Sequence, residues 1–103
     1  MFIMIENKSK LISKMARIFG NKTSLKIILS LENGKKYSFN DFKKICKACS
    51  PSVNYSIMVL KKEGVVKRVK VSKKHKKIYY ELTDYGKKCL EVIKKFLSIH
   101  KNQ

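Results

Sequence analysis

The residues best suited to chemistry in this sequence are the cations of one stretch, residues 61–77. This stretch holds eight lysines and Arg68 against one acid, Glu63, which is a net charge of +8 in 17 residues. Its inner part, 72–77, has no apolar residue, while the residues on either side alternate between apolar and polar types. Such alternation is typical of half-buried strands, so the pattern predicts a β-hairpin with strands at about 65–71 and 77–82. Lysines at a hairpin tip can bind a phosphate backbone or enter a minor groove.

The whole chain is also strongly basic. Its 103 residues include 25 Lys and Arg against 7 Asp and Glu, a formal net charge of +18. A field of this sign attracts polyanions, which favours a nucleic acid or an anionic membrane surface as partner. The alternative is a general lysine bias, which would fit the presence of only two arginines, Arg17 and Arg68.

Three cysteines offer the other reactive groups. Cys46 and Cys49 form a C-x-x-C, a spacing found in zinc and redox sites. Zinc usually needs four ligands, and His75 and His100 are far away in sequence. We therefore expect no metal and no cofactor, and cysteines that are small apolar residues on a buried helix face. A thiol switch at Cys46 and Cys49 is the alternative.

The chain length and composition predict one domain. No run approaches the roughly 20 apolar residues of a membrane span, and the initial apolar run is short for a signal peptide. We expect an intracellular, cytoplasmic protein with no membrane partner. We divide the single domain 1–103 into an N-terminal helical segment (1–22), a core (23–83) and a C-terminal helix (84–103).

Apolar spacing predicts five helices. The first lies within 8–19, and Thr23 or Ser24 caps the second, whose apolar face is Leu25, Ile28, Leu29 and Leu31. Ser38 or Asn40 caps the third, with Phe42, Ile45, Cys46 and Cys49 turned inward. Ser50 caps the fourth, about 51–63, Pro51 suits its first turn, and Gly64 ends it. Thr83 caps the last. The fold class is α+β, mainly α: a winged helix-turn-helix with a two-stranded wing and flanking helices.

The fourth helix can present a face to DNA. Val53, Ile57 and Leu60 form its apolar stripe, so its other side is available for base edges. Asn54 can pair with adenine, Met58 can pack on a thymine methyl, and Ser50 and Ser52 lie where helix N–H groups bind phosphate. In the alternative, Tyr55, Met58 and Val59 pack against the N-terminal segment or a partner chain, which would bury the whole helix. The predicted DNA-binding residues are Ser50, Ser52, Asn54, Tyr55, Met58, Lys62, Arg68, Lys70, Lys73, Lys74, His75, Lys76 and Lys77.

Two motifs carry a resemblance to a known family. Leu60-Lys61-Lys62-Glu63-Gly64-Val65 is similar to the end of its recognition helix, and Tyr80-Glu81-Leu82-Thr83-Asp84-Tyr85-Gly86 to the segment after its wing. Over residues 23–97 the chain resembles the winged-helix transcriptional regulators of the MarR, HxlR and PadR type. It departs from them at the wing tip, where lysines replace the common arginine. The small size and lysine content also resemble regulators of archaea and their viruses.

The resemblance implies a homodimer whose terminal helices pack together and whose recognition helices enter successive major grooves. The residues expected at this interface are Leu11, Met15, Cys89, Ile93, Phe96, Leu97 and His100. Alternatively, Cys89, Ile93 and Phe96 close the core of the protomer. No small-molecule effector can be named from the sequence.

Three functions compete. The leading hypothesis is a sequence-specific regulator that binds double-stranded DNA as a homodimer. The second is an architectural protein that binds DNA through charge without a preferred sequence. The third is a protein-interaction module, which would need a buried or acidic recognition helix. We expect no enzyme, since the sequence has no glycine-rich phosphate loop and no evident acidic pair.

Overall fold

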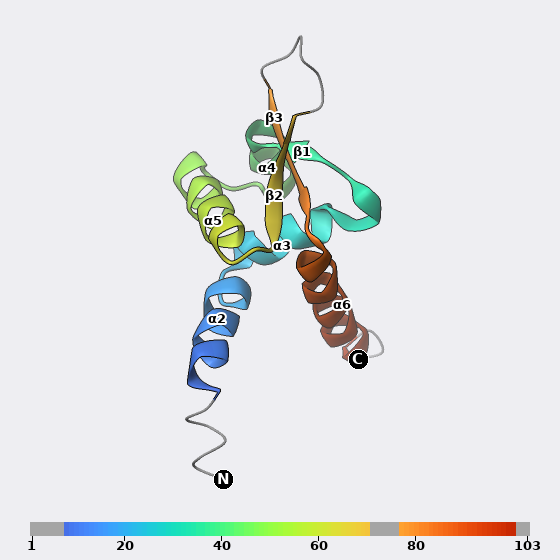
Figure 1. Ribbon diagram of the computed structural model, residues 1–103. Coiled ribbons are helices and arrows are strands. Elements are labelled where there is room, and N and C mark those ends of the chain that lie inside the picture. Colours follow the sequence, from blue (N-terminus) through green and yellow to red (C-terminus); the bar gives the residue numbers. More distant parts are fainter. Residues whose placement is uncertain (1–7, 71–76, 101–103) are drawn as a thin grey trace.

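The computed structural model describes residues 8–70 and 77–100. These residues form five α-helices and a three-stranded sheet (Figure 1). In chain order the elements are α2 (Ser9–Phe19), α3 (Lys22–Ser30), the 3-10 turn η1 (Glu32–Gly34), β1 (Tyr37–Ser38), α4 (Phe39–Cys46), α5 (Ser50–Lys62), β2 (Val66–Lys70), β3 (Ile78–Leu82) and α6 (Asp84–Ile99). The expected fold class, a mainly helical winged helix-turn-helix with flanking helices, is confirmed.

Helix α3 lies at the centre of the molecule and packs against α2, α4, α5 and α6. The β2–β3 wing points to one end of the molecule, while α2 and α6 extend toward the opposite end (Figure 1). The molecule is therefore elongated, with principal extents of 55 × 34 × 25 Å. The wing and the terminal helices are thus separate regions of one fold.

The sheet has the strand order β1-β3-β2 and is antiparallel throughout. In the wing, Val66 pairs with Leu82 and Lys70 with Ile78, so the two strands are in register over their whole length. The two-residue strand β1 pairs Tyr37 with Tyr80 and adds a third strand to the expected two. A strand this short has too few residues to show an alternation of apolar and polar types, which is why the sequence pattern did not predict it.

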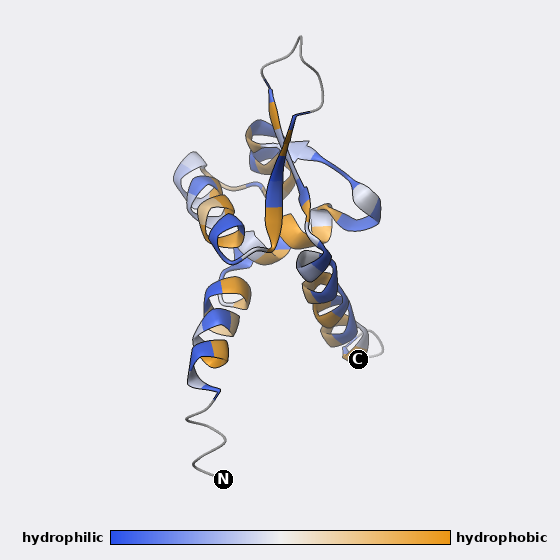
Figure 2. Ribbon diagram, viewed as in Figure 1, coloured by the Kyte–Doolittle hydropathy of each residue, from blue (hydrophilic) through white to orange (hydrophobic). Residues whose placement is uncertain are grey.

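One apolar cluster joins the helices to the base of the wing. Phe42 of α4 is fully buried, and its ring centroid lies 6.0 Å from that of Tyr37 and 6.3 Å from that of Tyr80. Ile18, Ile27 and other buried aliphatic side chains complete the cluster. The hydrophobic segments of α3 and the lower part of β2 meet in this central region (Figure 2). This core fixes the positions of α5 and of the wing strands.

The helix caps differ in part from expectation. Thr83 caps α6, and Ser38, one of two expected candidates, caps α4 in a capping box with Asp41. However, Asn21 rather than Thr23 or Ser24 caps α3, because its side-chain oxygen accepts from both of their N–H groups. At α5, Cys49 occupies the N-cap position, so Ser50 is the first helical residue.

The inward face expected for α4 is partly wrong. Phe42 and Cys46 are buried, but the Ile45 side chain is 43% exposed and Cys49 is exposed. Helix α4 ends at Cys46, and Lys47 takes a left-handed conformation with φ of 50°. This turn breaks the helical spacing on which the expectation for Cys49 depended. In α3, Ile27 is a fully buried residue that the predicted apolar face omitted.

Candidate nucleic-acid interface

Helix α5 has one buried face and one exposed face. The predicted inner residues Val53, Ile57 and Leu60 all lie in the core. On the outer face, the side chains of Tyr55 and Met58 are 54% and 58% exposed. Residues 8–70 and 77–100 of the protomer thus leave these two side chains exposed, whereas Val59 is buried. Packing of Tyr55 and Met58 against a partner chain, part of the alternative expectation, stays untested.

The outer face carries a compact set of different side chains. Tyr55, Met58 and Lys62 follow one another at helical spacing, with Asn54 and Lys61 beside them, and all five are exposed. An amide, a phenol, a thioether and two ammonium groups can each contact a base edge or a phosphate. The structure thus brings the α5 residues of the predicted site onto one accessible surface.

The inner face of α5 is held close to α3 by small polar residues. Ser56 is fully buried, and its hydroxyl donates to the Asn21 side-chain oxygen at 3.5 Å. That same oxygen caps α3 by accepting from the backbone N–H of Thr23 at 2.8 Å. The start of α3 and the middle of α5 are therefore tied together. A helix anchored in this way can present its outer face with little freedom to rotate.

The N-terminus of α5 combines a thiol and a hydroxyl. The Cys49 sulfur lies 3.3 Å from the Ser52 hydroxyl oxygen. That hydroxyl, followed by the Ser52 backbone N–H, lowers the pKa of the Cys49 thiol below its usual 9.0. Ser50 and Ser52 are both half-buried. The predicted phosphate-binding end of the helix thus also holds an exposed thiol with increased thiolate character.

The wing strands divide their charges between two faces. Val66, Arg68 and Lys70 alternate with Lys67 and Val69, so the two sets lie on opposite sides of the sheet. The first set shares its side with Tyr80 and Leu82, which pack into the core beside α4 and α5. Arg68 and Lys70 thus lie on the side of the sheet that faces α5.

The remaining wing residues of the predicted site fall into two groups. Lys77 lies with its ammonium nitrogen 5.9 Å from the centroid of the Tyr79 ring, at the base of the hairpin loop. Lys73, Lys74, His75 and Lys76 fall outside the described residues. Their role at the wing tip stays a prediction.

The structure adds further cations that were not in the predicted site. Lys44 and Lys47 are exposed on α4 and in the turn that leads into α5, and Lys43 is half-buried beside them. Helix α4 packs directly against α5, which makes it the first helix of the helix-turn-helix. Their position just before the recognition helix was a signal in the sequence, because the first helix of this motif crosses the DNA backbone.

Comparison with known proteins identifies the family. The family model of the HxlR-like helix-turn-helix matches residues 18–103, which is most of the chain. The chain belongs to the HxlR-like helix-turn-helix family. It is accordingly a winged-helix, DNA-binding transcriptional regulator. No curated protein matches the sequence.

Solved structures of other regulators share the fold of this HxlR-like protein. The transcriptional repressor BigR from Xylella fastidiosa is 17% identical, with a TM-score of 0.73 over 96% of this chain and 95% of that chain. The redox regulator HypR in its oxidized form is 19% identical, with a TM-score of 0.76 over 89% of this chain and 95% of that chain. A mutant of MepR from a multidrug resistant S. aureus clinical isolate is 19% identical, with a TM-score of 0.74 over 98% of this chain and 74% of that chain.

An apolar groove separates the terminal helices of the HxlR-like protein. It has a volume of about 690 Å³, its floor includes Leu25 and Leu29 of α3, and side chains of α2 and α6 form its walls. On α2, Leu11 and Met15 are 60% and 57% exposed. On α6, the side chain of Phe96 is 62% exposed. Alternating hydrophobic and hydrophilic bands along both helices show that they are amphipathic (Figure 2).

The residues expected at a dimer interface fall into two groups. Leu11, Met15, Phe96, Leu97 and His100 are exposed on the terminal helices. By contrast, Cys89 and Ile93 are only 5% and 7% exposed and belong to the core cluster, as the alternative for these two residues expected. The part of α6 up to Ile93 thus helps to close the core of the protomer, and the turns after it have exposed apolar side chains.

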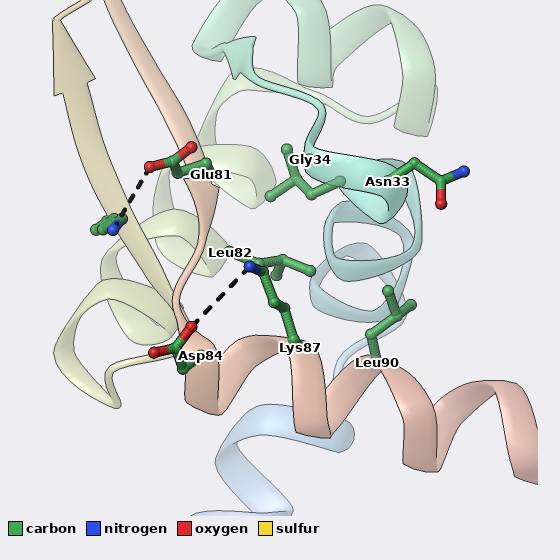
Figure 3. Close-up of a pocket in the computed structure, with 9 residues that line it drawn as sticks. Asn33, Gly34, Glu81, Leu82, Asp84, Lys87 and Leu90 are labelled. Atoms are coloured by element: carbon green, nitrogen blue, oxygen red, sulfur yellow. Dashed lines mark ion pairs between the residues drawn. The ribbon is translucent and has the colours of Figure 1, made fainter.

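A second cavity of the HxlR-like protein lies between η1, the base of the wing and α6 (Figure 3). Its volume is about 370 Å³. Lys67 pairs with Glu81 at 3.5 Å, and Lys87 pairs with Asp84 at 4.0 Å. The four charged residues that line this cavity thus form two pairs of opposite sign, so their formal charges cancel.

The cysteines do not form a metal site in the part of the chain that the structure describes. Residues 8–70 and 77–100 contain no group of three His, Cys, Asp or Glu side chains that could hold a metal ion. Cys46 and Cys89 are buried free thiols, and burial raises the pKa of both. Cys49 is the exception to the expected burial.

Among residues 8–70 and 77–100, none of the helices has the length and apolar character that a membrane span requires.

Proposed function

We propose that this protein regulates transcription as a homodimer that binds a two-fold symmetric DNA site. In each protomer α5 enters the major groove, and the basic wing contacts the backbone or the minor groove. The observation that carries the proposal is the contrast between the two faces of α5. Its inner face is anchored to α3 and the core, while Asn54, Tyr55 and Met58 are exposed beside a strongly cationic hairpin.

The contacts are proposed to divide by role. Asn54, Tyr55 and Met58 read base edges, because amide, phenol and apolar groups distinguish base pairs in the major groove. Arg68, Lys70 and Lys77 contact phosphates, as do the lysines of the tip, and these contacts position the protein without specifying sequence. Lys44 and Lys47 extend the phosphate contacts along α4.

The homodimer rests on the terminal helices. Exposed large apolar side chains gather on α2 and on the outer turns of α6, on either side of a nearly apolar groove. A second copy that inserted its own terminal helices would remove these side chains from water. This arrangement leaves the outer faces of the α5 helices and the wings free to bind DNA.

The test is selection of bound fragments from random duplex DNA at about 0.15 M salt with excess competitor DNA. The expected result is enrichment of a two-fold site whose half-sites are about one helical turn apart, near 10 bp. Replacement of Asn54 or Tyr55 by Ala should remove the preference for that site.

The second candidate, an architectural DNA-binding protein, is favoured by the net charge of +18. It predicts binding that fades as salt rises, with no enriched sequence. In that case wild type and Asn54→Ala would each bind every duplex sequence with the same affinity. This result would exclude sequence-specific regulation.

A further inference from the structure

The C-terminal end of α5 has an ordered turn that connects it to the wing. The Val65 N–H donates to the Leu60 carbonyl at 2.8 Å, and the Gly64 N–H donates to the Lys61 carbonyl at 3.1 Å. Gly64 has a φ of +76°, and Leu60 and Val65 are both fully buried. These features define a Schellman motif, in which a left-handed glycine ends the helix and an apolar contact closes the turn.

This turn rests directly on the start of α6. The Thr83 hydroxyl donates to the Gly64 carbonyl, and the Thr83 backbone N–H donates to the Val65 carbonyl at 3.0 Å. A Cβ at Gly86 would lie only 2.0 Å from the Val65 carbonyl oxygen. Thus the two motifs that carry the family resemblance are in contact, and α6 begins against the end of the recognition helix.

The same turn is also attached to α2 by the cap residue Glu63. Its side chain is only 10% exposed, and Oε1 accepts from Arg17 Nε at 2.8 Å. Lys14 Nζ lies 4.0 Å from Oε2 and 4.6 Å from the ring centroid of Tyr85 on α6. Glu63 therefore lies where α2, α5 and α6 converge.

The charge of Glu63 is unfavourable for the proposed DNA contacts. It is the one acid among residues 61–77, a stretch that otherwise carries nine cations. A free anion here would weaken the attraction of the surrounding lysines for phosphate, but Arg17 and Lys14 lie against this carboxylate and neutralise much of its charge. The Glu63 carboxylate is therefore placed to hold α2 against the end of α5.

We propose that Glu63 is a positioning residue that fixes the angle between the recognition helix and the N-terminal helix of the dimer. Since α2 and α6 form the proposed dimer interface, this angle sets the distance between the two recognition helices. Glu63 and Arg17 thereby determine which spacing of half-sites the dimer accepts. This inference rests on the proposed function as a dimeric DNA-binding regulator.

The two effects of Glu63 predict opposite changes in DNA affinity. Glu63→Gln removes one negative charge, so binding to a single half-site should be unchanged or tighter. If the carboxylate also positions α5, the same substitution should weaken binding to the correctly spaced pair of half-sites. We expect the ratio of paired-site to half-site affinity to fall about tenfold, within the range of coupling between sites.

The experiment measures affinities for a half-site and for paired sites whose spacing varies one base pair at a time. Glu91→Gln is the matched control, because it removes the same charge from an exposed position of α6. The triple variant Lys14→Gln, Arg17→Glu, Glu63→Arg restores an ion pair between positions 17 and 63 and removes the Lys14 ammonium that would repel the new guanidinium. We expect a relaxed spacing preference for Glu63→Gln, an unchanged one for the control, and recovery in the triple variant. Circular dichroism checks that each variant is folded, and sedimentation checks that it is still a dimer.

The outcomes separate this inference from the proposed function. If wild type prefers a defined spacing and Glu63→Gln keeps both that spacing and the affinity ratio of Glu91→Gln, the positioning role is overturned while dimeric DNA recognition stands. If wild type itself shows no preference for paired half-sites, the proposed function and the inference both fail.

Discussion

At the scale of single residues, the start of α5 differs chemically from the rest of the proposed DNA-binding surface. Cys49 is exposed at the N-cap of α5, and hydrogen bonds from Ser52 lower its pKa. The other two thiols are buried, and burial raises their pKa. Of the three thiols, Cys49 alone combines exposure with a lowered pKa, the two features that favour reaction of a thiol.

We predict that iodoacetamide at neutral pH labels Cys49 well before Cys46 and Cys89 in the native protein. The carbamidomethyl group would occupy the end of α5 that we propose to bind phosphate, so labelled protein should bind DNA less tightly, by about tenfold, roughly the loss of one charge-assisted phosphate contact. Mass spectrometry of timed samples and a binding titration measure the two effects. Cys49→Ser is the control: it should bind DNA and resist the reagent. Labelling without any loss of affinity would show that DNA does not approach this residue.

Asp41 makes a second residue-scale contribution, to stability. The Ser38 backbone N–H, helped by the Ser38 hydroxyl, holds the pKa of the Asp41 carboxyl below its usual 3.8 despite partial burial. A carboxyl whose folded pKa is depressed stabilises the fold above its unfolded pKa, and this contribution is lost as pH falls through the folded pKa.

Asp41→Ala should therefore lower the free energy of unfolding at pH 7 by about 1 kcal/mol, the typical effect of a lost cap. The difference from wild type should shrink as pH falls below 3.8, where the wild-type carboxyl becomes protonated. Urea unfolding at several pH values and one fixed protein concentration measures it. Asn40→Ala, in the same turn, is the uncharged control. A difference that stays constant down to the lowest pH would mean that the carboxylate does not stabilise α4.

At the scale of elements, the contact between the α5–β2 turn and α6 holds the wing to the terminal helix. Gly64 and Gly86 both belong to it, but for different reasons. Gly64 has a positive φ with open space around its Cβ position, whereas Gly86 lies against the Val65 carbonyl. One glycine is required by backbone conformation and the other by close packing.

We predict that Gly64→Ala costs about 1 kcal/mol, the strain of a left-handed non-glycine residue. Gly86→Ala should cost about 3 kcal/mol, because the added methyl overlaps a backbone oxygen. Replacing a glycine by alanine inside a helix normally raises the free energy of unfolding. A fall in that free energy for Gly86→Ala would therefore report the close packing against the Val65 carbonyl. Chemical denaturation measures both. Equal effects at the two positions would contradict the close approach of α6 to the turn.

The extent to which these elements follow from the sequence depends on their length and regularity. The stripe Val53, Ile57, Leu60 on α5 is predicted correctly because it repeats over several turns. Thr83 is predicted as a cap because it comes directly before a long amphipathic helix. By contrast, β1 has two residues and is defined by its pairing with β3, a contact distant in sequence. Long-range pairing of this kind leaves no periodic signal.

Part of the candidate site also follows from the sequence, and part of it does not. The outer face of α5 follows from its inner stripe, since a residue on the opposite side of an anchored helix must face solvent. The exposure of Cys49 does not, because it depends on the left-handed Lys47 that ends α4. Alternation along β2 separates the wing charges into two faces, but only the register of β2 and β3, which places Arg68 opposite Tyr80, shows which face is turned toward the core.

At the scale of the whole molecule, charge and apolar surface are separated. The wing lies toward one end of the molecule, and α2 and α6 extend toward the other end (Figure 1). These two helices form the walls of the apolar groove. A dimer formed through the terminal helices would therefore join the protomers without covering the cationic surfaces. A dimer with two such surfaces would contact more phosphates than a single protomer, so its DNA affinity would fall more steeply as salt rises.

This separation gives the last prediction, for Phe96→Glu. A carboxylate in place of an exposed phenyl ring should break the dimer and leave the protomer folded, because Phe96 lies outside the core cluster. If each protomer contacts about six phosphates, the slope of log K against log salt is about −11 for the dimer and about −5 for the monomer. Sedimentation and binding titrations at several salt concentrations measure both quantities. Ser98→Glu adds the same charge to α6 and controls for charge alone. A monomeric variant that keeps the wild-type slope would show that one protomer makes all the phosphate contacts, and a variant that stays dimeric would exclude Phe96 from the interface.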